Sequence, residues 1–175
     1  MKRFLSIIFI FLLSFGLFGL DDTASHAITI QINEIVLIGL NNTSSLVLTT
    51  NNPTNPGEDV AGDTNASKLL QYTSIVASGT TRNITVKWGA TEQAPAGTSL
   101  KIEATSIPAN CGTTAGEITI SDTAQAIVTG VGSCATGIGA NGTEVTYTFG
   151  IDNKLLLEIG DNQTVNITFT ITDAS

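Results

Sequence analysis

The sequence is short of the side chains on which most enzyme chemistry depends. Its 175 residues include one histidine, His26, and two cysteines, Cys111 and Cys134. Serine and cysteine nucleophiles of the usual kind need an imidazole to accept their proton, and zinc sites use imidazoles or several thiolates. His26 lies in a segment that we expect to be removed, so we predict no enzyme, no catalytic residue and no cofactor. A hydrolase that uses carboxylates alone stays open as an alternative.

Basic side chains are also scarce. The chain has 7 lysines and arginines against 15 aspartates and glutamates, a formal net charge of −8 and a pI of about 4.3. The basic residues are scattered along the sequence, whereas a protein that binds nucleic acid needs lysines and arginines in clusters to displace counterions. We therefore expect no nucleic-acid partner.

The first 27 residues have the layout of a secretory leader. Lys2 and Arg3 precede an apolar run from Phe4 to Leu20, and Ser25 and Ala27 are small residues at positions −3 and −1 of a cleavage site. We predict a signal peptide over residues 1–27 and a single domain over 28–175, located in the periplasm, at the cell surface or outside the cell. The alternative is an uncleaved anchor, because the run is close to the length that spans a bilayer. No second run of that length follows, so no membrane span is expected after cleavage.

The two cysteines can form one intramolecular bridge. In an oxidising compartment we expect a Cys111–Cys134 disulfide rather than two free thiols or bridges between chains. It should stabilise the fold by roughly 3 kcal/mol. No CxxC spacing or adjacent base lowers the pKa of either thiol, so the bridge is interpreted as structural.

Alternation of apolar and polar residues dominates the chain after Ile28. A period of two places one face of a strand on a core and the other in water, which is typical of antiparallel sheets. The pattern predicts an all-β antiparallel β-sandwich of nine or ten strands, with immunoglobulin-like or jelly-roll connectivity. The clearest alternating stretches are Ile28–Ile32, Ile84–Trp88, Leu100–Ala104, Ile118–Ile120, Val145–Ile151 and Val165–Ile171. Weaker strands are expected at Ser45–Thr49, Leu69–Val76, Ala124–Val128 and Leu155–Ile159.

A long polar stretch, Asn51–Ser67, is predicted to be a surface loop because its proline, glycine and asparagine content disfavours strands and helices. Within it, Glu58, Asp59 and Asp63 are candidate calcium ligands, since calcium prefers carboxylate and carbonyl oxygens on flexible loops. A solvated acidic loop is the alternative. With its neighbours the loop could form a binding site for a glycan or another small ligand.

Aromatic residues make up 6% of the chain. Sugar-binding sites commonly use aromatic platforms, and the predicted mature chain has five aromatic side chains. All but Tyr72 fall at inward positions of the alternating pattern, so we expect them to pack in the core. They are Tyr72, Trp88, Tyr147, Phe149 and Phe169.

The predicted mature chain begins with a strand-like stretch. Ile28, Ile30 and Ile32 could leave their own sheet and pair with a neighbouring molecule, because backbone pairing provides affinity and alternate side chains set the register. These three residues are therefore candidates for strand exchange. The alternative is that they form the first strand of their own sandwich.

The layout resembles that of the small secreted β-sandwich proteins of Gram-negative bacteria, of which fimbrial and spore-coat-U-like pilins are the best-known group. The shared features are a leader, an immediate strand, a body rich in Thr, Asn and Gly with two cysteines, and the alternating end TVNITFTITDAS. The resemblance implies a non-enzymatic, exported structural or surface-interaction protein, such as a fimbrial or coat subunit that self-associates or binds protein partners. A secreted binding module, with calcium assistance, is the alternative function.

Overall fold

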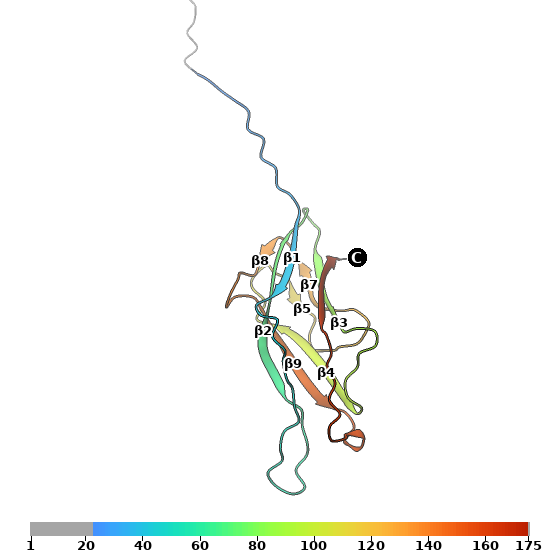
Figure 1. Ribbon diagram of the computed structural model, residues 1–175. Helices are drawn as coiled ribbons and strands as arrows, with labels where there is room; N and C mark the ends of the chain where they lie inside the picture. The colour runs from blue at the N-terminus through green and yellow to red at the C-terminus, as the bar shows by residue number, and fades with distance from the viewer. Residues whose placement is uncertain (1–22, 175) are drawn as a thin grey trace, which may run out of the picture. The chain divides into compact units, whose positions relative to one another are not determined.

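The computed structural model describes residues 23–174 and is all-β, with two antiparallel sheets (Figure 1). Residues 1–22, most of the predicted leader, lie outside the described part of the chain. The described residues divide into two units, of which the first ends at Ile32 and the second begins at Asn33.

Ten strands and one short 3₁₀ helix, η1 (Lys154–Leu156), are found among the described residues. The first sheet has the order β1 (Ile35–Leu40), β2 (Thr64–Ile75), β9 (Thr143–Ile151), β4 (Thr98–Thr105) and β6 (Ile118–Thr119), and β8 (Cys134–Ala135) also pairs with β2. The second sheet has the order β10 (Thr168–Asp173), β3 (Arg82–Lys87), β7 (Gln125–Val131) and β5 (Thr113–Thr114).

One hydrophobic core joins the two sheets, which makes the fold a sandwich. Strand side chains alternate between faces, and the buried positions of β3 and of the first half of β9 follow this period of two. The buried apolar residues are Leu70, Tyr72, Ile84, Val86, Ile102, Ala104, Cys111, Ile120, Ile127, Val128, Val131, Val145 and Tyr147. The predicted all-β class and antiparallel sheets are confirmed.

Consecutive strands change sheets repeatedly. Every connection from β2 to β8 crosses from one sheet to the other, and the connection from β9 to β10 crosses again. The two central strands of the first sheet, β9 and β4, pair over eight residues, from Thr98 opposite Ile151 to Thr105 opposite Glu144. This is the longest continuous ladder of the first sheet.

Several predicted strand boundaries were wrong. Leu155–Ile159 is not a strand: Asn153 caps η1 through its side chain, which accepts a hydrogen bond from the Leu155 N–H at 3.1 Å. Ser45–Thr49 carries no strand, and only Thr50 next to it bridges to Gly62. The Asn51–Ser67 loop is shorter than predicted, since β2 already begins at Thr64.

Candidate functional site

The isoleucine segment, Ile28–Ile32, stands out because its apolar side chains face solvent. Ile28, Ile30 and Ile32 are 74%, 86% and 79% exposed. Residues 23–34 carry no helix or strand, so the prediction that this stretch is a strand of its own sandwich was wrong. The alternation of apolar and polar residues is compatible with a strand. A strand forms, however, only where a neighbouring strand supplies hydrogen bonds. The first strand of the domain is β1, which begins three residues later at Ile35.

Strand β1 lies at an edge of the first sheet and is itself apolar, with the sequence IVLIGL. It pairs with β2 in antiparallel register, from Ile35 opposite Ile75 to Leu40 opposite Leu70. Ile35, Val36 and Leu37 are exposed. Apolar edge strands without charge are the parts of a sheet most disposed to associate with another chain.

Arg82 holds the two chain ends of the domain together. Its side chain is buried, and it forms ion pairs with Glu34, just before β1, and with Asp173, the last residue of β10, at 3.2 Å. Its Nη1 donates to Ser74 Oγ at 2.9 Å and to the carbonyl oxygen of Ile35 at 3.3 Å. A buried charge must be paired and hydrogen-bonded, and Arg82 meets both conditions. Glu34 is therefore fixed at the start of the sandwich domain.

The two cysteines lie next to each other, 2.5 Å apart, with no bond shown between them. Cys134 belongs to β8 of the first sheet, and the buried Cys111 precedes β5 of the second. Burial and the neighbouring Cys111 raise the pKa of the Cys134 thiol to about 12. Because the thiolate is the reactive form, a free Cys134 thiol would be inert at neutral pH.

Tyr72 is buried beside these cysteines, contrary to the prediction that it is the one outward-facing aromatic residue. Its hydroxyl donates to the carbonyl oxygen of Cys111 at 2.7 Å and shares a hydrogen bond with Thr143 Oγ1 at 3.1 Å. Burial raises its pKa to about 12. Tyr147 is also buried, whereas Trp88, Phe149 and Phe169 are half-buried. The five aromatic side chains thus form no exposed platform for a sugar.

The candidate calcium ligands are not brought together. Glu58 accepts hydrogen bonds from the backbone N–H groups of Thr54 and Asn55, and with the Asn55 side chain these lower its pKa to about 2. Asp59 forms an ion pair with Lys154. Asp63 lies at the start of β2, and no group of three or more metal-ligating side chains occurs in residues 23–174. The structure provides no calcium-ligand set here.

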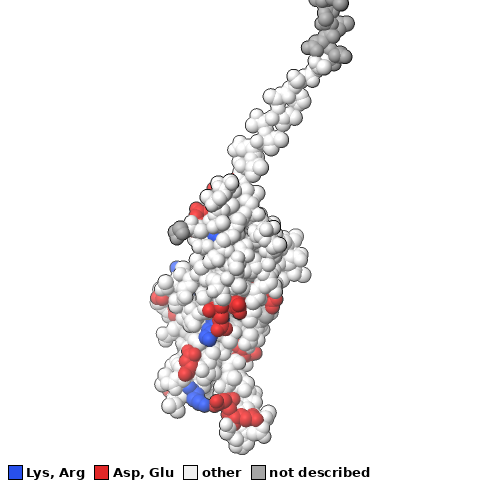
Figure 2. Space-filling model, turned by 180° about the vertical axis from the view of Figure 1, so that it is seen from behind, with Lys and Arg blue, Asp and Glu red and all other residues white. Residues whose placement is uncertain are grey.

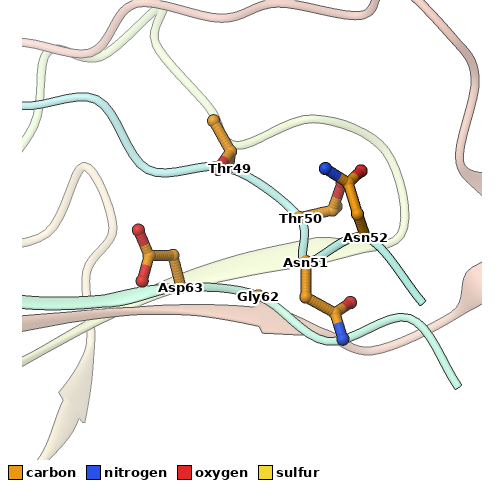
Figure 3. A pocket seen from close by; sticks show the side chains of 6 residues that line it. All are labelled: Thr49, Thr50, Asn51, Asn52, Gly62 and Asp63. Carbon is orange, nitrogen blue, oxygen red and sulfur yellow. The ribbon is translucent and has the colours of Figure 1, made fainter. Parts of the chain in front are cut away.

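A small polar pocket of about 350 Å³ lies at the base of the long loop (Figure 3). Its walls come from two segments joined by the bridge between Thr50 and Gly62. The Asn51 side chain accepts a hydrogen bond from the Ala61 N–H at 2.6 Å, which fixes the neck of the loop. The lining residues are Thr49, Thr50, Asn51, Asn52, Gly62 and Asp63. These hydroxyl, amide and carboxylate groups suit a small polar ligand. No aromatic side chain is among the lining residues.

Within residues 23–174, the basic side chains form separate contacts and do not cluster on one surface. On the face seen in Figure 2, acidic and basic side chains are intermingled. Lys101 forms an ion pair with Glu117 at 3.1 Å. Lys68 is buried, and its ammonium donates to Asn42 Oδ1 and to the carbonyl oxygen of Ser44, both at 2.5 Å. These contacts fasten the chain after β1 onto β2.

Comparison of the chain with protein-family models, with curated proteins and with solved structures gave no match. Over residues 23–174, no helix has the length and apolar character needed to cross a membrane. The function is therefore argued from the geometry alone.

Proposed function

We propose that the protein is an exported, non-enzymatic structural subunit, of fimbrial or coat type, whose copies associate through the isoleucine segment. One observation carries the proposal: three alternating isoleucines lie exposed on a stretch that has the pattern of a strand but forms none. Strand addition uses such a segment, because the backbone supplies hydrogen bonds and every second side chain fills an apolar site.

Burial of the isoleucine side chains would contribute to association. One buried isoleucine contributes about 1.5–3 kcal/mol, so three offset a large part of the roughly 4–15 kcal/mol that association costs, and backbone hydrogen bonds would have to supply the rest. The side chains of Ile28–Asn33 carry no charge, and cleavage after Ala27 would leave a positive α-amino group at Ile28, which the net charge of −8 on the chain does not repel.

The domain does not depend on a donated strand to complete its core. Its last strand, β10, pairs with β3 from Thr168 opposite Lys87 to Asp173 opposite Arg82. The proposed association therefore adds the segment to a folded acceptor. This distinguishes it from subunits that remain unfolded until a strand arrives.

Electron microscopy of the purified protein tests this function. The chain is expressed with its leader, and processing is verified by N-terminal sequencing. We expect filaments or oligomers for the intact protein and monomers for a form that lacks Ile28–Ile32. The matched control is Val47→Gln, which removes one exposed apolar side chain elsewhere and should assemble normally. Strict monomers for the intact protein, or equal assembly without the segment, would defeat the proposal.

We also infer that Cys111 and Cys134 are joined in a disulfide that ties the two sheets together. Their separation of 2.5 Å supports this pairing, as does their placement, with Cys134 in β8 of the first sheet and Cys111 two residues before β5 of the second. The repeated crossing between sheets supports jelly-roll over immunoglobulin-like connectivity, because several consecutive strands of an immunoglobulin domain are neighbours in the same sheet. Thiol labelling of the unfolded, unreduced protein should find no free thiol; two labelled cysteines would contradict the disulfide.

A second candidate function is a binding module for a small polar ligand, favoured by the pocket at the base of the long loop. Glycan-array binding, or a thermal shift with calcium, that disappears in Asp63→Asn would support it. The matched control is Asp122→Asn, which changes an acidic side chain on another loop. Silence in both assays would remove this candidate.

A further inference from the structure

A second group of exposed apolar side chains lies on the connection between β9 and β10. Leu155, Leu156 and Ile159, here called the 155–159 patch, are 89%, 50% and 106% exposed. Three large apolar residues within five positions are an unusual concentration, since single exposed apolar residues are the norm on protein surfaces. The patch therefore has the character of an interaction surface.

Hydrogen bonds and an ion pair hold the connection between β9 and β10 against the rest of the domain. The N–H groups of Asp152 and Asn153 both donate to the carbonyl oxygen of Gly97 at 2.9 Å. Lys154 forms an ion pair with Asp59 of the long loop. Farther along, the Asn166 N–H and side chain donate to Glu92 at 2.7 and 2.6 Å, and these bonds lower the pKa of that carboxyl group.

The patch and the start of β1 lie at opposite ends of the domain. Ile35 pairs with Ile75, the last residue of β2, whereas the first residue of β2, Thr64, pairs with Thr148 close to the end of β9. η1 follows that end of β9 directly. In Figure 1 the orange coil of residues 154–156 lies at the opposite end from the beginning of β1.

Two different apolar surfaces on one chain allow a head-to-tail contact. A contact between unlike surfaces is heterologous, and it produces an open chain of subunits when the rotation does not close a ring. The patch is bordered by the acidic residues Asp59, Glu158 and Asp161. The isoleucine segment has no acidic side chain, and its α-amino group after cleavage is positive. It can therefore approach such a border without repulsion, whereas an anionic lipid surface would be repelled.

We propose that the 155–159 patch is the docking surface for the isoleucine segment of a second copy of this chain. The inference rests on the proposed function and adds the acceptor to it. Next to the patch, residues 161–167 carry no strand although Val165 and Ile167 alternate with polar residues. The patch would bury the isoleucine side chains, and this extended stretch would lie beside the arriving backbone.

Mixing two complementary variants tests the acceptor by sedimentation velocity. The segment variant is Ile28→Gln/Ile30→Gln/Ile32→Gln, and the patch variant is Leu155→Gln/Leu156→Gln/Ile159→Gln. All six positions are exposed, so both variants should keep the thermal stability of the intact protein. The control Ile138→Gln, at an exposed apolar residue outside the patch, should assemble as the intact protein does.

We expect each variant alone to be monomeric, and an equal mixture to form a species of twice the monomer mass, because one variant retains the patch and the other the segment. A patch variant that assembles as the intact protein does, or a mixture that stays monomeric, would overturn the assignment of the acceptor. A segment variant that assembles normally would refute the proposed function instead. The two failures are thus distinguishable.

Discussion

Arg82 is the residue whose replacement should destabilise the domain most clearly. Arg82→Met keeps much of the apolar stem but removes the guanidinium that bonds to Ser74 and to the carbonyl oxygen of Ile35. A buried polar group left without its partner costs about 1–3 kcal/mol. The ion pairs with Glu34 and Asp173 add little, since these carboxylates are 70% and 86% exposed and return to water. We therefore expect a loss of about 2–4 kcal/mol in the free energy of unfolding.

Urea unfolding followed by tryptophan fluorescence measures this loss, because the chain has a single tryptophan, Trp88, one residue after β3. Glu34→Gln and Asp173→Asn are the controls, and each should cost less than about 1 kcal/mol. A loss below about 0.5 kcal/mol for Arg82→Met would refute the reasoning, as would a loss for either carboxylate variant equal to that of Arg82→Met. The first result would mean that the guanidinium contacts contribute nothing. The second would mean that the exposed carboxylates, and not burial, carry the stabilisation.

Three further predictions concern the disulfide, a close backbone approach and a turn. If the proposed disulfide is present, reduction should lower the free energy of unfolding by roughly 3 kcal/mol, and equal urea midpoints with and without reductant would count against the bond. Gly62→Ala should destabilise or prevent folding, because its Cβ would lie 1.6 Å from the carbonyl oxygen of Phe149, whereas Gly39→Ala has open space and should be near neutral by thermal unfolding. Glu58 has a lowered pKa of about 2, so its stabilisation of the turn is complete above its ordinary pKa of 4.5 and is lost as the pH falls through about 2. The protection of the Thr54 and Asn55 amides, measured relative to their intrinsic exchange rates at each pH, should fall across that window, and constant protection would contradict it.

The strands that bury one face were predictable, because a period of two reports burial directly. Val145–Ile151 alternates without interruption and lies within β9. The same rule predicted a strand at Ile28–Ile32, where the side chains are exposed. Alternation shows that a stretch can form a strand, but it does not identify the strand with which the stretch pairs. The exposed Leu155–Ile159 run was also taken for a strand, although three successive leucines do not alternate.

The contacts that organise the candidate site were beyond prediction from one sequence. Arg82 meets Glu34 and Asp173 across separations of 48 and 91 residues. Nothing in the local pattern around any of the three identifies its partners, because long-range pairing depends on strand order. The burial of Tyr72 beside Cys111 has the same origin. By contrast, the proximity of the two cysteines followed from their number and the expected compartment.

Hydrogen exchange at the backbone amides of the isoleucine segment tests the central claim most directly. The exchange rates of Thr29–Asn33 are measured by mass spectrometry in the monomeric and in the assembled protein. Strand addition predicts that these amides become protected on assembly, while the amides of the β4–β9 ladder, already paired, do not change. Assembled particles in which Thr29–Asn33 exchanges as fast as in the monomer would contradict the account.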